Sequence, residues 1–281
     1  MKTSNKLLIS LAILLIVIPI LVVAINVKLN YKERGIEDSY LGTQEINNET
    51  FDQKSKGRIT IPLQTPFEAI QFKDAKGFNV QLFIKEDNRY GLKVPEKFKN
   101  DLKFEVDANG VIQFAINNFT DDNNGEKIVL VIYCPKINRV SVANSSILEF
   151  SARADSLTLN VDHSESLFLS GDITNNDPKG KVISVINPTK IGKLFLNLNS
   201  TTFHGYTNAF KDLHVTANKS AIEIGNEDDN KEFPFDNLNI KTTDTSSVKL
   251  QNVKVKTFTG DFSDATTLQI PTPLLKQLFK K

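Results

Sequence analysis

A short apolar phrase recurs six times between Val140 and Ile270, and it restricts how this chain can fold more than any other feature. Each copy has two apolar positions two residues apart, then a polar link of Ser, Thr, Asn and Asp, then a second such pair. Because side chains alternate between the two faces of a strand, each pair predicts a strand with one buried face. The pairs are Val140, Val142 with Leu148, Phe150; Leu157, Leu159 with Leu167, Leu169; Leu194, Leu196 with Phe203, Gly205; Leu213, Val215 with Ile222, Ile224; Leu238, Ile240 with Val248, Leu250; and Phe258, Gly260 with Leu268, Ile270.

The spacing of the copies indicates how these strands are arranged. Successive copies begin 17, 37, 19, 25 and 20 residues apart, and the two long intervals contain polar insertions. A unit of about 20 residues is typical of solenoids, in which one coil cannot bury its apolar face alone and stacks on its neighbours. A closed β-sandwich is the competing all-β arrangement, because it also has short strands at regular spacing. The similar phrases favour a stacked, β-helix-like solenoid over residues 137–281.

Composition narrows the class of protein. Apolar residues make up 40% of the 281-residue chain and charged residues 24%, as in ordinary folded proteins rather than disordered ones. The 34 basic residues nearly balance the 33 acidic ones, so we expect no nucleic-acid partner.

The N-terminus contains nineteen uncharged residues, Leu7–Ile25, which match the apolar thickness of a bilayer. We predict an uncleaved transmembrane helix as the membrane anchor of residues 1–29, with the bulk of the chain in the periplasm or at the cell surface. A signal peptide cleaved near Ala24 is the alternative. Lysines flank both ends, so charge does not decide the orientation. Residues 30–58 are polar and without periodicity, which predicts a solvated linker.

Residues 59–136 read as an N-terminal β region that continues into the repeats. Asn109 and Gly110 lie between two apolar segments and predict a hairpin. The segment Ile128–Tyr133 is apolar throughout, so we expect it to be buried on both faces. The expected strands are Phe67–Phe72, Phe78–Ile84, Tyr90–Val94, Leu102–Val106, Val111–Ile116 and Ile128–Tyr133.

The order of these segments carries a family resemblance. The openings Phe67–Ile70 and Phe78–Leu82, the hairpin end Gly110–Ile112 and the strand end Tyr133–Pro135 precede the stacked repeats. In this order they resemble the GIN domain, the head domain of auto-transporter adhesins. The resemblance covers about residues 67–270. It implies a β-solenoid-like module outside the cytoplasmic membrane of a bacterium, in a family without an established activity.

The links between paired strands depart from that family, whose links are usually of the Ser-Gly-Ser type. Glycine is absent from all of them, and Ser, Thr and Asn take its place. We expect these side chains to form tight corners through hydrogen bonds to the backbone. The links read Asn144–Ser146, His163–Ser166, Asn199–Thr202, Asn218–Ser220 and Thr245–Ser247.

Motifs for catalysis, metals and cofactors are missing from the sequence. Cys134 is the single cysteine and ends an apolar strand, which predicts a buried core residue, and the three histidines form no recognisable ligand spacing. We therefore expect neither a cofactor nor a metal. The acidic runs Asp121–Asn124 and Asn226–Asn230 match no Ca²⁺ loop, and a solvated insertion is favoured over a metal site for both.

The polar links supply the candidate functional residues. Asp162, His163 and Glu165 cluster in one link, where paired carboxylates could act as acid and base on a polysaccharide. Charged corner residues that are simply solvated are the favoured interpretation of this cluster. Residues that we expect to face a ligand are Asn144, Asp162, His163, Glu165, Asn199, Thr201 and Asn218.

Three functions remain open on the sequence alone. The favoured one is a non-catalytic binding, adhesion or scaffold module of the cell envelope that recognises a glycan or an envelope protein. The alternatives are a polysaccharide-active enzyme and an envelope-sensing partner of a neighbouring membrane protein. The C-terminal residues 271–281 predict a short amphipathic helix that closes the open end of the stack, with attachment to a lipid surface as its alternative.

Overall fold

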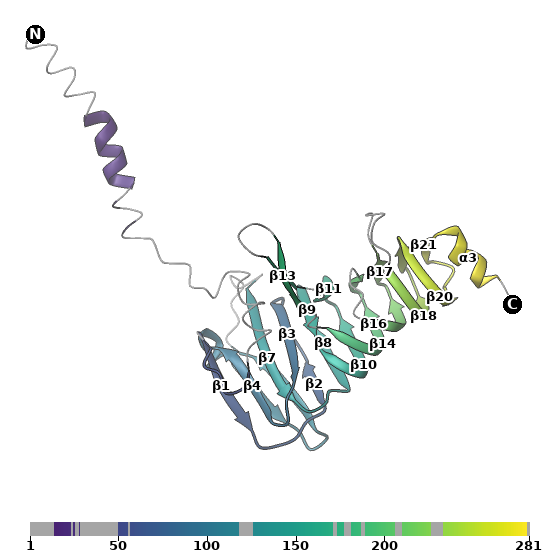
Figure 1. Ribbon diagram of the computed structural model, residues 1–281, viewed down its shortest axis with the longest axis horizontal. Coiled ribbons are helices and arrows are strands. Elements are labelled where there is room, and N and C mark those ends of the chain that lie inside the picture. The colour runs from purple at the N-terminus through teal and green to yellow at the C-terminus, as the bar shows by residue number, and fades with distance from the viewer. Residues whose placement is uncertain are drawn as a thin grey trace, which may run out of the picture. The chain divides into compact units, whose positions relative to one another are not determined.

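The chain separates into two compact units, Met1–Glu45 and Ile46–Lys281. The structure is a computed structural model that describes residues 14–23, 25, 28, 50–55, 57–117, 126–170, 173–176, 181–186, 189–205, 210–225 and 233–279 (Figure 1). In the first unit, residues 14–23 are helical and exposed. A search of the described residues finds no helix both long and apolar enough to span a membrane. The predicted anchor segment Leu7–Ile25 lies partly outside these residues.

The second unit consists almost entirely of strands, which confirms the all-β prediction. One sheet has ten strands in the order β1-β4-β7-β3-β9-β11-β15-β17-β19-β21, and another has nine in the order β20-β18-β16-β14-β10-β8-β2-β6-β5. The elements are β1 Arg58–Leu63, β2 Ala69–Phe72, β3 Asn79–Glu86, β4 Tyr90–Pro95, the 3₁₀ turn η2 Glu96–Phe98, β5 Leu102–Val106, β6 Val111–Ile116, β7 Lys127–Cys134, β8 Arg139–Ala143, β9 Ile147–Ser151, β10 Arg153–Asp162, β11 Ser166–Leu169, β12 Ile173–Asn176, β13 Val182–Ile186, β14 Lys190–Asn199, β15 Thr202–Gly205, β16 Phe210–Asn218, β17 Ala221–Ile224, β18 Phe233–Thr243, β19 Ser247–Leu250, β20 Val253–Asp261, β21 Thr267–Gln269 and α3 Thr272–Leu278.

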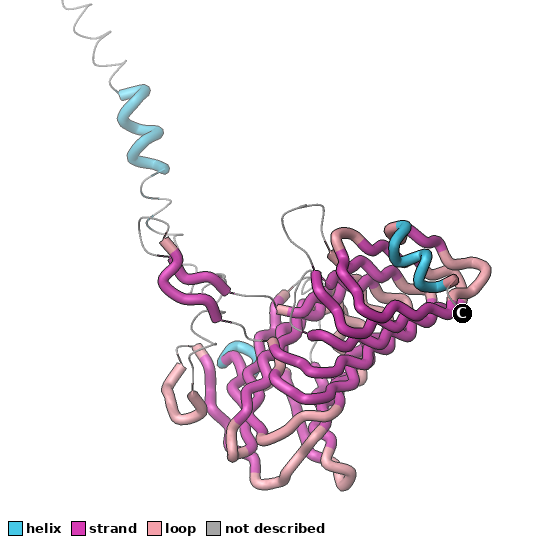
Figure 2. Tube along the Cα trace, turned by 45° about the vertical axis from the view of Figure 1, so that its right-hand side comes forward, coloured by secondary structure: helices cyan, strands magenta, loops and turns pink. Residues whose placement is uncertain are grey.

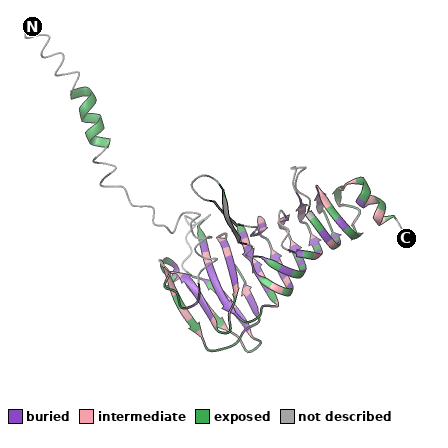
Figure 3. Ribbon diagram, in the orientation of Figure 1, coloured by how far each residue is buried: buried purple, intermediate pink, exposed green. Residues whose placement is uncertain are grey.

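From β8 onward, apart from β12 and β13, the chain alternates between the two large sheets. From β10 onward a longer strand of the nine-stranded sheet precedes a shorter strand of the ten-stranded sheet, and each pairs in parallel with its counterpart in the next coil (Figure 2). The repeated apolar residues of the first five copies are buried between the sheets (Figure 3). Leu196, Val215 and Ile240, which lie in successive coils, are at most 1% exposed. The period-two pattern therefore located the interior correctly.

The last copy differs from the other five. Leu268 is 41% exposed and Gly260 is also exposed, whereas the apolar positions of the earlier copies are buried. The reason is that β20 and β21 end their sheets, so no following coil covers them.

The alignment of the first two copies also differs from the prediction. Val140 pairs with Leu159 and Val142 with Val161, so β8 is displaced by two residues from the expected match of Val140 with Leu157. Leu157 instead pairs only with the following coil, opposite Leu194. Because β10 has three buried alternating positions and β8 has two, the apolar pattern alone allowed Val140 to pair with either Leu157 or Leu159.

The longest interval between copies is explained by an added hairpin. β12 and β13 pair with each other in antiparallel fashion and form a separate two-stranded sheet between β11 and β14. The second insertion, with the acidic run Asn226–Asn230, lies outside the described residues, as does Asp121–Asn124.

The N-terminal β region continues directly into the coils, because β2 pairs with β8 and β3 pairs with β9. The expected strands Leu102–Val106 and Val111–Ile116 agree with β5 and β6. They pair in antiparallel fashion, and Gly110 adopts a positive φ of 70° at the predicted turn. The hairpin prediction is confirmed.

Strand β7 is buried on both faces, as predicted for Ile128–Tyr133. Ile128, Leu130 and Ile132 belong to the main core, while Val131 and Tyr133 form a second cluster on the opposite face. That second cluster is completed by Phe51, whose ring lies 5.3 Å from the Tyr133 ring.

Phe51 belongs to the expected solvated linker, so the end of that segment differs from the expectation. Lys93 of β4, which is 0% exposed, donates hydrogen bonds to the backbone oxygens of Thr50 and Gln53 at 2.7 Å and to the Ser55 hydroxyl at 3.0 Å. A Cβ at Gly91 would lie only 2.2 Å from the Phe51 ring, so glycine there leaves space for the ring. Residues 50–55 are therefore held on the sheet by the buried Phe51 ring and by the hydrogen bonds of Lys93, while residues 52–54 are exposed.

Cys134 is buried at the end of β7, as predicted. Burial raises the pKa of its thiol to about 12, so the nucleophilic thiolate is scarce at neutral pH. We expect iodoacetamide to leave the folded chain unlabelled and to label it after unfolding in guanidinium, as measured by mass spectrometry. Rapid labelling of the folded chain would contradict this placement of the thiol.

The C-terminal helix α3 packs on β20, the edge strand of the nine-stranded sheet. Leu274 is its buried residue. The Gln277 amide oxygen accepts a hydrogen bond from the Phe258 backbone N–H at 2.9 Å, and its amide nitrogen donates to the Val255 carbonyl at 3.3 Å. This side chain thereby satisfies backbone groups that a further strand would otherwise pair.

Candidate functional site

The predicted site residues lie at the corners where each long strand turns into the following short strand. One residue of each corner has a positive φ between 47° and 57°: Asn144, His163, Ser200, Lys219 and Asp244. Such a backbone is costly for residues other than glycine, and Asn and Asp tolerate it best. Since glycine is absent here, other contacts have to stabilise the corners.

A column of buried hydroxyls provides these contacts. Ser145, Ser164, Thr201, Ser220 and Ser246 are each at most 4% exposed. The hydroxyl oxygens accept backbone N–H groups from the preceding coil, at 3.2 Å from Ser164 N to Thr201 Oγ1 and 3.1 Å from Thr201 N to Ser220 Oγ. The same hydroxyls donate within their own corner, for example from Thr201 to the Asn199 carbonyl at 3.0 Å. The expectation that hydroxyl side chains bond the backbone at these corners is confirmed.

A chain of side-chain hydrogen bonds next to the hydroxyl column links three predicted site residues. The Asn199 amide donates to the Asp162 carboxylate at 2.6 Å, and the Asn218 amide donates to the Asn199 side-chain oxygen at 2.8 Å. The Thr243 hydroxyl extends this chain of hydrogen bonds by donating to Asn218 at 3.0 Å. Asp162, Asn199 and Asn218 therefore contact one another along the stack.

The remaining predicted residues lie nearer the solvent. His163 Nδ1 is 2.9 Å from the Asp162 carboxylate, and the Glu165 carboxylate accepts a hydrogen bond from the Ser146 hydroxyl at 2.8 Å. The Asn144 amide donates to Asp74 at 3.2 Å. The structure thus brings Asp162, His163 and Glu165 to one corner, as their sequence proximity requires. Within the described parts of the chain, no group of three His, Cys, Asp or Glu residues could hold a metal ion.

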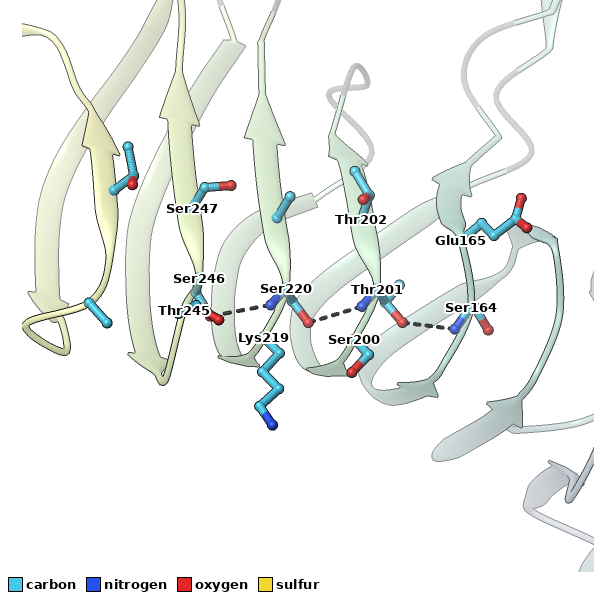
Figure 4. Close-up of a pocket in the computed structure, with 13 residues that line it drawn as sticks. Ser164, Glu165, Ser200, Thr201, Thr202, Lys219, Ser220, Thr245, Ser246 and Ser247 are labelled. Carbon is cyan, nitrogen blue, oxygen red and sulfur yellow. Dashed lines mark hydrogen bonds between the residues drawn. The ribbon is translucent and has the colours of Figure 1, made fainter.

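A groove of about 650 Å³ runs across the same corners of five successive coils (Figure 4). Glu165 and Thr201 are the two predicted residues that line it. The Thr201 hydroxyl belongs to the buried column, so its side chain does not project into the groove. The lining consists of Ser164, Glu165, Ser200, Thr201, Thr202, Lys219, Ser220, Ala221, Thr245, Ser246, Ser247, Ala265 and Thr267.

Small outward side chains form the floor of this groove. Strand pairing places Thr202, Ala221, Ser247 and Thr267 opposite one another at the first position of β15, β17, β19 and β21. We call these four residues the floor row. None of them was selected from the sequence, although aligning the copies by strand register would have shown a small residue at this position in each.

Longer side chains project from the same face two residues further along the strands. They form a second row, here called the flanking row: Phe168, His204, Glu223, Lys249 and Gln269. The Phe168 and His204 rings stack with centroids 4.6 Å apart and planes inclined by 11°. His204 Nδ1 lies 3.1 Å from the Glu223 carboxylate. Residues two apart on a strand share a face, so the flanking row lies alongside the floor row.

The charges lining the groove are Glu165 and Lys219, which are of opposite sign. Lys219 extends away from the hydroxyl column in Figure 4, and its Nζ lies 3.5 Å from the Asp244 carboxylate. The Thr245 backbone N–H holds the pKa of Asp244 below its ordinary value, and Lys219 lowers it further. Asp244 therefore remains charged at neutral pH and partly neutralises Lys219.

Comparisons with known proteins give structural similarities alone. No family model and no curated protein sequence matches the chain. A crystal structure described as a "putative adhesin" from Bacteroides fragilis is 13% identical, covers 77% of this chain and 98% of its own, and has a TM-score of 0.42. A "putative lipid binding protein" from Parabacteroides distasonis is 10% identical, covers 76% and 94%, and has a TM-score of 0.36. At these TM-scores the similarities assign neither a family nor a function.

Proposed function

We propose that this protein is a non-catalytic binding module of the cell envelope that holds an extended polar ligand in the groove across its coils. The observation that carries the proposal is the groove itself, about 650 Å³ in volume and lined by Ser, Thr and Ala from five coils together with Glu165 and Lys219. Cavities of roughly 300–1,000 Å³ are the usual size for ligand sites. Hydroxyl groups donate and accept hydrogen bonds, so such a lining suits a polar ligand.

We take the second unit to be a β-solenoid related to GIN-domain modules, and this architecture supports the proposal. Parallel pairing from coil to coil sets the short strands in register, so the groove meets a paired position on each of these strands along its length. Repeat proteins commonly use extended surfaces of this kind for binding. Adhesion and scaffolding would both follow from such a surface.

The proposed location rests on the sequence. The uncharged segment Leu7–Ile25 would anchor the chain in the membrane, and the body would lie in the periplasm or at the cell surface. There the groove would meet glycans and envelope proteins.

The non-catalytic part of the proposal is supported by the contacts of the two candidate carboxylates. Asp162 accepts a hydrogen bond from Asn199, and Glu165 accepts one from Ser146. Both groups therefore have partners in the corner structure. If the protein hydrolysed polysaccharide instead, turnover would be measurable and would disappear in Asp162→Ala or Glu165→Ala.

Filling the groove tests the proposal directly. Ala221 lies at the centre of the floor row, so Ala221→Arg places a long side chain where the ligand would lie. We expect the full-length variant to lose at least about tenfold in affinity for a ligand found in a panel of neutral polysaccharides, acidic polysaccharides and extended peptides. Binding is measured by surface-immobilised ligand assays.

Thr216→Arg is the matched control, because Thr216 is exposed on the nine-stranded sheet away from the groove. The control should bind like the unmodified chain. Equal binding by all three proteins would place the ligand elsewhere and overturn the proposal, as would the absence of binding to every member of the panel.

A further inference from the structure

The groove has a repeat length that restricts the polymer it can hold. Its floor row crosses parallel strands at right angles, and neighbouring strands in a sheet lie about 4.8 Å apart. A ligand lying in the groove therefore meets an equivalent position every 4.8 Å or so. An extended peptide advances about 3.3 Å per residue and loses this match at the next coil. A sugar ring in an extended glycan advances by nearly the distance between coils.

The groups at each step match the chemistry of a sugar. Thr202, Ser247 and Thr267 offer hydroxyls, and Ala221 offers a methyl group at the middle of the floor row. Their small size leaves room for a ring in front of each coil. Sugar hydroxyls both donate and accept hydrogen bonds, as do Ser and Thr.

The flanking row adds an aromatic surface beside this floor. Phe168 and His204 stack at 4.6 Å on the strands that begin the groove, and both are partly exposed. Because the two rings cover each other's faces, their edges border the floor row and place apolar carbon atoms beside its hydroxyls, a combination that is common in ligand sites.

Charge restricts the ligand further. Glu165 and Lys219 are the charged residues that line the groove and are of opposite sign, and the Asp244 carboxylate lies 3.5 Å from Lys219. A uniformly acidic or basic polymer would gain no net attraction along the groove. The lining therefore favours an uncharged polymer.

We propose that the groove binds a linear, uncharged glycan laid across the coils with one sugar residue for each coil. This inference rests on the proposed binding function and adds the class of ligand. Residues from five coils line the groove, so a pentasaccharide fills it.

The experiment measures affinity against chain length for the full-length protein. Cello-, manno- and xylo-oligosaccharides of increasing length are titrated by isothermal calorimetry, with polygalacturonate and a flexible peptide as charged and non-sugar competitors. We expect affinity for at least one neutral series to rise up to the pentasaccharide and then to level off. Ala221→Arg should weaken this binding at least about tenfold and Thr216→Arg should not.

Ser247→Gln, a smaller obstruction in the same row, keeps the test decisive if Ala221→Arg fails to fold. Binding of polygalacturonate or peptide that is lost in the groove variants, without neutral-glycan binding, would leave the binding function standing and overturn the glycan inference. Glycan binding that the groove variants leave intact would overturn both. Folded protein that binds no member of the panel would overturn both as well.

Discussion

Phe203→Ala should lower the free energy of unfolding by about 3–5 kcal/mol. Phe203 is 0% exposed and stands between Leu167 and Ile222 in the column of inward side chains along the short strands. A Cβ on Gly205 would lie 3.1 Å from the Phe203 ring, so the surrounding structure is fitted to this ring. Removing the ring leaves a cavity that parallel strands, held on both sides by hydrogen bonds, cannot easily close.

Phe195→Ala is the matched control, because it changes the same residue type in the same coil. Phe195 is 37% exposed on the outer face of β14 and stacks on His214 with centroids 4.9 Å apart. Its loss should cost only about 1 kcal/mol. Urea unfolding followed by circular dichroism measures both variants. Equal losses would contradict the assignment of inner and outer faces.

This contrast between Phe203 and Phe195 also shows what the sequence could predict. Both phenylalanines stand in strands of alternating polarity, and the alternation alone assigns Phe203 to the interior and Phe195 to the surface. Inward positions were predictable throughout the first five copies because a stack needs the same face buried in every coil. The pairing of Val140 with Leu159 rather than with Leu157 was not predictable, because β10 has three buried apolar positions and β8 has two.

The sequence contains no pattern that predicts the contact of residues 50–55 with the sheet. Phe51 is a single apolar residue in a polar segment, and its partner Tyr133 lies more than eighty positions away in the chain. Lys93 looks like an ordinary surface lysine, yet it is buried because two backbone oxygens and a hydroxyl of this segment surround its ammonium group. Contacts of this kind depend on the folded chain path and not on periodicity.

The corners beside the groove could be predicted from the sequence, but five of the seven predicted site residues do not line it. Polarity identified the corners, and the structure places the groove there. The same residue types, however, occupy the buried column and the floor row: Thr201 points inward and Thr202, the next residue, outward. Only the register of each corner distinguishes a hydroxyl that stabilises the turn from one that faces the groove.

Thr201→Val tests this distinction, because it removes the hydroxyl and nearly preserves the shape of the side chain. The Ser164 backbone N–H, which donates to Thr201 Oγ1 at 3.2 Å, is left without that acceptor in a buried corner. An unsatisfied buried donor costs about 1–3 kcal/mol, so we expect a loss of that size in urea unfolding. Thr216→Val, the same change at an exposed position, should stay within about 0.5 kcal/mol.

The binding measurement separates the two roles of Thr201. If its hydroxyl only stabilises the corner, the folded Thr201→Val variant binds the groove ligand like the unmodified chain, because the groove surface is presented by Thr202, Ala221 and Ser247. A ligand-facing hydroxyl would give the opposite result, with weaker binding and unchanged stability. Since the hydroxyl already donates to Asn199 and accepts from Ser164, it has little capacity left for a ligand. Stability, and not affinity, is therefore the property that this substitution should change.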